Sequence, residues 1–125
     1  MSAVLHSSAV LALLFRERGA EAVQDWLGGA LMCTVNYSEV AGKLVKLGQA
    51  VEQVQSTLAR LPIRWQEFTL ERSLLAASLQ QYNTRGVSLG DRACLALAMQ
   101  TGLPLITSDQ RLAELELELE IHVFR

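Results

Sequence analysis

Four side chains that can bind a metal ion stand where predicted strands end or predicted helices begin. His6 and Asp109 each follow a short apolar run, whereas Glu39 and Asp91 each lie in the first turn of a predicted helix. Carboxylate oxygens are the preferred ligands of hard divalent cations such as Mg²⁺, which keep several waters and often contact substrate phosphate. A cation held in this way can activate water and offset charge on a phosphodiester. The residue types therefore indicate metal-assisted hydrolysis.

Each of these side chains also has a purely structural interpretation. Glu39 stands three residues after Asn36, which is the spacing of a helix capping box, and Asp91 stands three residues after a serine. Asp109 is suited to a helix N-cap, and His6 can be a buried histidine with both ring nitrogens satisfied. If these interpretations hold alone, the chain is an α/β domain without a site. The metal hypothesis therefore depends on the four side chains lying together.

Strand and helix candidates alternate along the chain and would position these residues. Buried strands are predicted at 3–5, 31–35 and 103–107, with edge strands at 63–68 and 115–123, although the segment up to about 116 would also suit a helix. Helices are predicted near 8–15, 22–26, 36–47, 51–61, 70–82 and 88–100, and a polar turn at 83–86. This pattern predicts a three-layer α/β/α domain with a mostly parallel central sheet. Ligands bind such sheets beyond the carboxyl ends of the strands.

Composition indicates one domain spanning residues 1–125. Half of the residues are apolar, and the net charge is −2 from 11 basic and 13 acidic residues. A protein that binds nucleic acid by charge alone is normally basic, so this balance fits better with an acidic cluster neutralised by a metal. Cys33 and Cys94 lie in apolar runs and are expected to be buried hydrophobic residues rather than zinc ligands. Without a signal peptide or a membrane-length apolar run, a cytoplasmic location is expected.

Four stretches, namely residues 4–14, 34–44, 86–98 and 102–109, resemble the motifs of the PIN-domain family. They follow the order and spacing of that family, and in particular of the VapC-like toxins of bacterial toxin–antitoxin pairs. The most specific is the run Ser-Leu-Gly-Asp-Arg-Ala-Cys-Leu-Ala-Leu-Ala, which occupies residues 88–98.

The resemblance implies a parallel sheet flanked by helices and metal-dependent endonucleolytic cleavage of RNA, with Mg²⁺ or Mn²⁺ as the cofactor. It assigns the acidic metal ligands to Glu39, Asp91 and Asp109, and supporting hydroxyls to Ser8 and Thr107. The implied partners are an RNA substrate and a small antitoxin that wraps the toxin, blocks the site and usually binds DNA. A homodimer is also implied.

His6 departs from the family pattern, which has an aspartate at the end of the first strand. Imidazole is a poor ligand for Mg²⁺ but suits Zn²⁺ and is acceptable for Mn²⁺. We therefore expect His6 to weaken metal binding and to impair cleavage by this chain. Two explanations compete: a lineage that has lost or retuned its activity, and a substitution that permits production of a toxic protein. The second is slightly favoured, because the other ligand positions are intact and decay would usually affect more than one of them. The rival hypothesis is a catalytically inactive PIN-fold module that is retained for antitoxin binding and repression of its own operon.

Basic side chains such as Arg85, Arg92 and Arg111 are candidates for an RNA groove. Ordinary solvated surface is the simpler interpretation for most of the basic residues. Arg92 is the first to test, because it stands beside Asp91 in the sequence.

Overall fold

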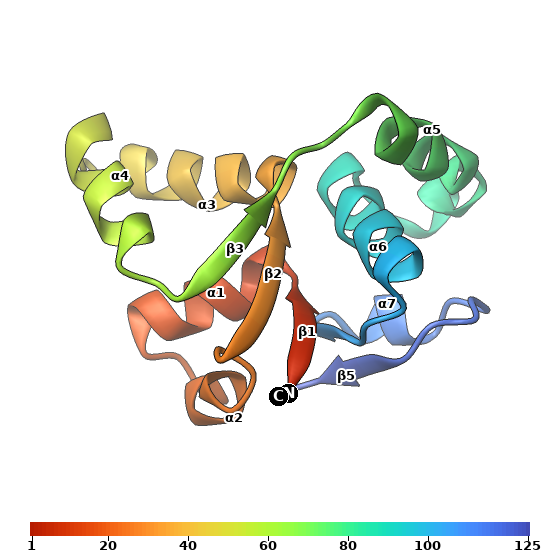
Figure 1. The fold of residues 1–125 in the computed structure, drawn as a ribbon, viewed down its shortest axis with the longest axis horizontal. Helices are drawn as coiled ribbons and strands as arrows, with labels where there is room; N and C mark the ends of the chain where they lie inside the picture. Colours follow the sequence, from red (N-terminus) through yellow and green to blue (C-terminus); the bar gives the residue numbers. More distant parts are fainter.

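The computed structural model describes the backbone of residues 1–125 and every side chain except those of residues 83–85. Its sheet is formed by β1 (Ser2–Leu5), β2 (Gly29–Cys33), β3 (Ile63–Gln66), β4 (Leu105–Thr107) and β5 (Ile121–Val123). The strands lie in the order β3-β2-β1-β4-β5, and every neighbouring pair is parallel (Figure 1). The carboxyl ends of all these strands therefore lie at the same edge of the sheet.

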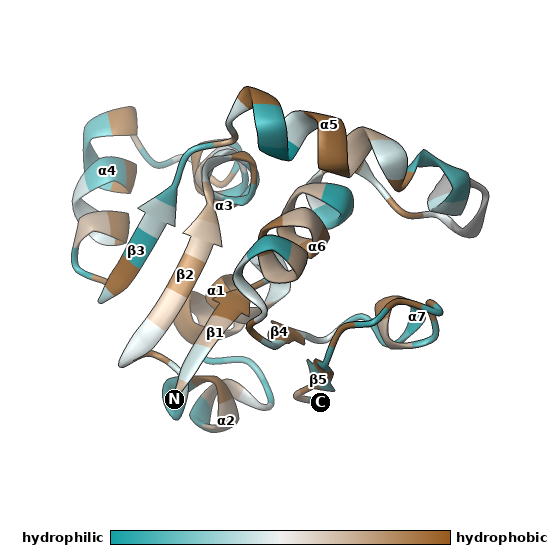
Figure 2. Cartoon of the chain, turned by 45° about the vertical axis from the view of Figure 1, so that its right-hand side comes forward, coloured by the Kyte–Doolittle hydropathy of each residue, from teal (hydrophilic) through white to brown (hydrophobic). Residues whose placement is uncertain are grey.

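Helices cover both faces of this sheet (Figure 1). They are α1 (Ser7–Phe15), α2 (Ala20–Gln24), α3 (Thr34–Lys46), α4 (Val51–Ala59), α5 (Leu70–Ser78), α6 (Leu89–Thr101) and α7 (Gln110–Ala113), with a 3₁₀ helix, η1, at Gln80–Arg85. Side chains of α1 to α4 form the core on one face, and α6 and α7 contribute to the core on the other. In Figure 2, hydrophilic and hydrophobic residues alternate along α4 and α5, whereas the end of β1 is hydrophobic.

The central strands are apolar because both faces of a parallel sheet are buried. Successive side chains of β1 point to opposite faces, so Leu5 joins the core beneath α1 and α3 while Val4 joins the core beneath α6. Residues 93–98 of α6 are all fully buried. This helix contacts β1, β2 and β4 as well as α5, which explains why its sequence is apolar nearly all round.

The predicted fold class is confirmed, with differences at the ends of individual elements. The predicted edge strand at 63–68 is present as β3. The predicted strand at 31–35 ends two residues earlier, because Thr34 already begins α3. The alternating segment 115–123 forms a strand only over Ile121–Val123, since β4 offers just three residues for pairing.

The helix predicted over 70–82 is divided between α5 and η1. The side chains at the centre of the predicted polar turn at 83–86, including that of Arg85, lie outside the described residues. Cys33 and Cys94 are buried free thiols, and burial raises the pKa of both. In the part of the chain that the structure describes, no helix is long and apolar enough to cross a membrane.

Candidate functional site

The candidate residues lie where helices begin beside the carboxyl ends of the central strands. β1 leads into α1 through His6, and β4 leads into α7 through Asp109. Asp91 lies in the first turn of α6. Glu39 lies in the second turn of α3 rather than the first, because that helix begins at Thr34. Helix N-termini carry partial positive charge, so this edge of the sheet favours carboxylates and other anions.

His6 connects β1 to α6 through its imidazole ring. Its Nε2 lies 2.8 Å from Oδ1 of Asp91, and its Nδ1 lies 2.8 Å from Oγ of Ser8 and 3.2 Å from Oγ1 of Thr107. An ionised carboxylate only accepts hydrogen bonds, so Nε2 carries a proton and donates it to Asp91. In the neutral ring, Nδ1 then accepts from the Ser8 hydroxyl, and it also N-caps α1 by accepting from the backbone N–H of Ser8.

Ser8 and Thr107, the predicted supporting hydroxyls, hold the turn between β4 and α7. Oγ of Ser8 accepts a hydrogen bond from the backbone N–H of Ser108 at 3.0 Å. Oγ1 of Thr107 accepts one from the backbone N–H of Asp109, also at 3.0 Å. The two hydroxyl oxygens are 3.4 Å apart. A continuous hydrogen-bond network therefore runs from this turn through His6 to Asp91.

Asp91 is buried and both of its carboxylate oxygens have partners. Oδ1 accepts from His6, and Oδ2 accepts from the backbone N–H of Ser88 at 3.0 Å. The backbone N–H of Asp91 donates in return to Oγ of Ser88, which completes the predicted capping box. Burial by itself raises the pKa of the Asp91 carboxyl, but the hydrogen bonds from His6 and Ser88 and the charge of His6 together lower it below its ordinary value.

Glu39 is exposed to solvent but is anchored on one side by buried polar groups. Its Oε1 accepts hydrogen bonds from Oγ of Ser7 at 2.5 Å and from Nδ2 of Asn36 at 3.0 Å. Asn36 is fully buried, and its Nδ2 also lies 3.0 Å from the backbone oxygen of Gly90. The interpretation of Asn36 as a helix cap is wrong, because the N-cap of α3 is Cys33. Asn36 instead connects the Glu39 carboxylate to the first turn of α6.

Gly90 allows the Glu39 carboxylate to lie directly against α6. A Cβ atom at Gly90 would overlap both oxygens of that carboxylate. Any larger residue at this position would push Glu39 away from Asn36 and Ser7. The glycine of the Ser-Leu-Gly-Asp motif thus has a steric role in the site.

Asp109 is paired with Arg111. It is the N-cap of α7, and its Oδ1 accepts from the backbone N–H of Arg111 at 3.0 Å. Nε of Arg111 also donates to Oδ1 at 3.1 Å, and a terminal guanidinium nitrogen donates to Oδ2 at 2.8 Å. These hydrogen bonds lower the pKa of the Asp109 carboxyl, against the effects of partial burial and the charge of Asp91.

The donor atoms suit a hard divalent cation, but they are bound to partners within the chain. Among the side chains that the structure describes, no three from His, Cys, Asp and Glu lie close enough to share one metal ion. Asp91 is engaged by His6 and Asp109 by Arg111, while Glu39 is held through one oxygen. The chemistry of three carboxylates at one edge of the sheet fits Mg²⁺ or Mn²⁺. Binding such a cation at the oxygens that His6 and Arg111 occupy requires these two side chains to release Asp91 and Asp109.

Sequence reasoning missed Ser7, and it named Arg111 only as one candidate for an RNA groove, with Arg92 as the first arginine to test. Neighbouring helix residues point about 100° apart, so Arg92 cannot share the direction of Asp91. Its guanidinium instead lies 3.5 Å from the backbone oxygen of Ala76 in α5. The pairing of Arg111 with Asp109 could have been predicted, because Arg111 stands two residues after a predicted N-cap, where a side chain can reach back to the capping carboxylate.

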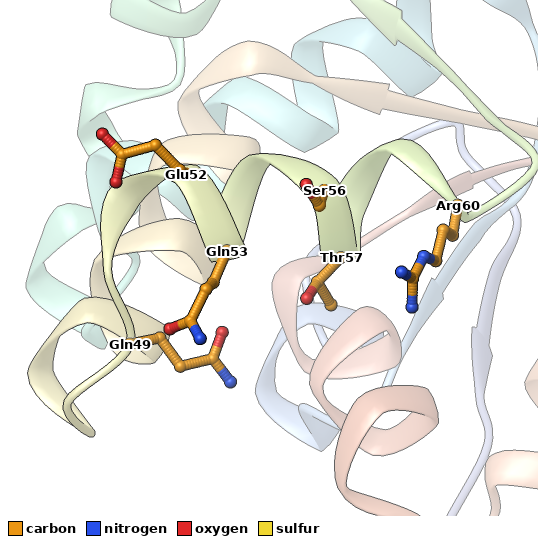
Figure 3. A pocket seen from close by; sticks show the side chains of 6 residues that line it. All are labelled: Gln49, Glu52, Gln53, Ser56, Thr57 and Arg60. Carbon is orange, nitrogen blue, oxygen red and sulfur yellow. The ribbon is translucent and has the colours of Figure 1, made fainter.

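A pocket of about 460 Å³ lies away from this edge of the sheet, along the outer surface of α4 (Figure 3). It is lined by Gln49, Glu52, Gln53, Ser56, Thr57 and Arg60. The pocket is open and polar, and it includes none of the predicted site residues. The candidate site therefore does not coincide with this pocket.

The contact between Gly90 and Glu39 can be tested with a pair of glycine substitutions. Alanine at a helix interior position is usually more stable than glycine by about 0.5–1 kcal/mol. We expect Gly42→Ala in α3 to show this gain, because nothing lies within 4 Å of its added Cβ. We expect Gly90→Ala to show little or none of it, because the new methyl group breaks the hydrogen bonds of Glu39. Urea unfolding of both variants measures the difference, and equal gains would contradict this account of Gly90.

The lowered pKa of Asp91 makes the stability of the fold depend on pH. The contribution of its ionised form is fully present above about pH 4, the ordinary carboxyl value, and is lost as the pH falls through the lowered native value. We expect His6→Leu, which removes the ring hydrogen bond and its charge, to lose less stability than the parent chain between pH 5 and pH 3. Urea unfolding at pH 5, 4 and 3 measures both losses. Parallel declines would show that His6 does not lower this pKa.

Comparisons with known proteins show the fold of this chain through solved structures and its family through a family model. A comparison with curated protein sequences found no significant match. A toxin–antitoxin complex from Klebsiella pneumoniae contains a similar chain, with a TM-score of 0.71 and 21% identity over 87% of this chain and 88% of that one. For VapBC2 from Rickettsia felis, bound to a promoter DNA fragment, the TM-score is 0.74 and the identity is 15% over 98% of both chains. For VapBC-5 from Mycobacterium tuberculosis, the TM-score is 0.65 and the identity is 19% over 99% of this chain and 98% of that one. Such likenesses show the fold, and the PIN domain family model matches residues 3–117, so the chain belongs to the PIN-domain family.

Proposed function

We propose that the chain is a VapC-like ribonuclease toxin of a toxin–antitoxin pair, acting on RNA with Mg²⁺ or Mn²⁺. The observation that carries this proposal is the placement of three carboxylates, on α3, α6 and the start of α7, around the carboxyl ends of the central strands. This is where ligands bind parallel α/β sheets. Membership of the PIN-domain family supports a nuclease.

Glu39, Asp91 and Asp109 are the proposed metal ligands. A divalent cation, when bound, would offset negative charge on the phosphodiester and activate water for its hydrolysis. Around these ligands, Asn36 fixes the direction of the Glu39 carboxylate, and Ser88 fixes that of Asp91. The N-terminus of α1 adds partial positive charge that favours a phosphate at this edge of the sheet.

His6 is proposed to impair cleavage by this chain. It supplies a ring nitrogen at a position where the family has a carboxylate, so the site has one negative charge and one oxygen ligand fewer. Its Nε2–H also occupies an oxygen of Asp91 that a cation would need. Both effects weaken the binding of a hard cation.

The proposed partner is a small antitoxin that covers the site and reaches DNA on behalf of the pair. Matched structures from Rickettsia felis and Salmonella typhimurium are VapBC complexes with DNA, which supports this part of the proposal. We also propose that the chain forms a homodimer and acts in the cytoplasm.

The contacts of His6 favour a second candidate function. Its ring caps α1 and contacts Ser8, Thr107 and Asp91, and the last contact gives the Asp91 carboxylate a partner in the absence of any metal. This arrangement also suits a PIN-fold module that binds the antitoxin and represses its operon without cutting RNA.

RNA cleavage by matched variants tests the proposal. We expect His6→Asp to cut a structured RNA in Mg²⁺ or Mn²⁺ at least about tenfold faster than the parent chain, because it restores a carboxylate ligand. Adding Asp91→Asn should abolish this gain. His122→Asp, the same change at a half-exposed residue of β5, is the control for net charge and should leave the rate unchanged.

The contrary outcomes separate the two functions. If the parent chain and His6→Asp cut equally well, His6 is tolerated and its proposed effect is wrong. If neither cuts RNA but the antitoxin binds both tightly, the inactive module is the correct function.

A further inference from the structure

We infer that Arg111 is a phosphate-binding residue of the RNA site, which exchanges the carboxylate of Asp109 for a phosphate of the RNA backbone. This inference rests on the proposed function, since it takes RNA as the substrate. It concerns binding rather than cleavage, so it can be tested without the metal.

The first support is the geometry of the Arg111–Asp109 pair. The guanidinium approaches the carboxylate with Nε and a terminal nitrogen, at 3.1 and 2.8 Å, each directed at a different oxygen. The same two-pronged arrangement is how arginine binds phosphate, because two oxygens of a phosphate present a similar edge. Asp109 therefore holds the guanidinium in a conformation that is ready for a phosphate.

The second support is the exposure and position of Arg111. Its side chain is 60% exposed, so a large ligand can reach it. A Cβ atom at Gly86 would lie only 2.5 Å from a terminal nitrogen of Arg111. Gly86 has a φ of +78° and belongs to the segment that leads into α6, the helix that carries Asp91. The guanidinium thus lies between the start of α7 and the approach to α6, at the rim of the proposed metal ligands.

The third support is that the exchange does not require the burial of Arg111. Its guanidinium is solvent-exposed in the present pair, so a phosphate can replace Asp109 as its partner from the solvent side. Two other arginines whose side chains the structure describes have partners outside the site: Arg92 is directed at a backbone oxygen of α5, and Arg72 donates to Gln100 and to the backbone oxygen of Glu67. A bound metal that takes Asp109 would free Arg111 at the point where the RNA backbone must approach.

The test measures RNA affinity in a double-mutant cycle. The parent chain, Asp109→Asn, Arg111→Gln and the double variant are titrated into a fluorescent 20-nucleotide RNA of mixed sequence, at low salt with excess chelator. Asparagine caps helices as well as aspartate does, so Asp109→Asn retains the cap of α7 while it releases the guanidinium. Arg111→Gln changes an exposed side chain, and thermal unfolding confirms that each variant is folded.

We expect Asp109→Asn to bind RNA at least about threefold more tightly than the parent chain. In the Arg111→Gln background, the ratio of affinities produced by Asp109→Asn should be at most about half as large. Arg64→Gln, at an exposed position of edge strand β3, is the matched control, and the gain from Asp109→Asn should persist in that background. The remaining outcomes overturn the inference: an equal gain with and without Arg111 means that only the lost negative charge matters, and no gain means that Asp109 does not hold a phosphate-binding group.

These outcomes are independent of catalysis. If no variant cuts RNA but the coupling between positions 109 and 111 is present, the proposed cleavage is wrong and the phosphate contact stands. If His6→Asp cuts RNA but the coupling is absent, the nuclease function stands and Arg111 is only the structural partner of Asp109.

Discussion

The hydrogen bond from His6 to Asp91 connects the two halves of the domain at the carboxyl edge of the sheet. One partner ends β1 and caps α1, and the other opens α6, the most deeply buried helix. Ser8 and Thr107 attach the turn before α7 to the same ring. One imidazole therefore links the starts of α1 and α6 and the turn before α7. A substitution at His6 acts on the fold and on the site together.

The constraint behind this arrangement is electrostatic. Three carboxylates placed at one edge of a sheet need either cations or hydrogen-bond donors. In this chain the donors are its own: His6 and Ser88 for Asp91, Arg111 for Asp109, and buried amide and hydroxyl groups for Glu39. Helix N-termini add to the stabilisation. A nuclease of this kind must release some of these partners when it binds a metal, and the exposed pair at Asp109 is the easiest to release.

The sequence predicted the fold well where patterns are local. Short buried runs separated by amphipathic helices sufficed for the parallel sheet, and the caps at Asp91 and Asp109 followed from spacing. The strand predicted over residues 115–123 is longer than the observed β5, because β5 pairs only with the three residues of β4. This limit is a tertiary property that the alternating sequence does not contain. At the site, sequence motifs identified the candidate carboxylates. They could not reveal that Asn36 orients Glu39 or that Arg111 rather than Arg92 faces the acidic groups, since both depend on side-chain direction.

The central claim is that the three carboxylates form a metal site that His6 weakens. Calorimetric titration of Mn²⁺ into the parent chain and into His6→Asp tests it without any RNA. We predict that His6→Asp binds Mn²⁺ at least about tenfold more tightly than the parent chain, and that Glu39→Gln in the same background removes most of this gain. Equal affinities in the parent chain and His6→Asp, or a gain that survives the loss of the Glu39 carboxylate, would contradict it.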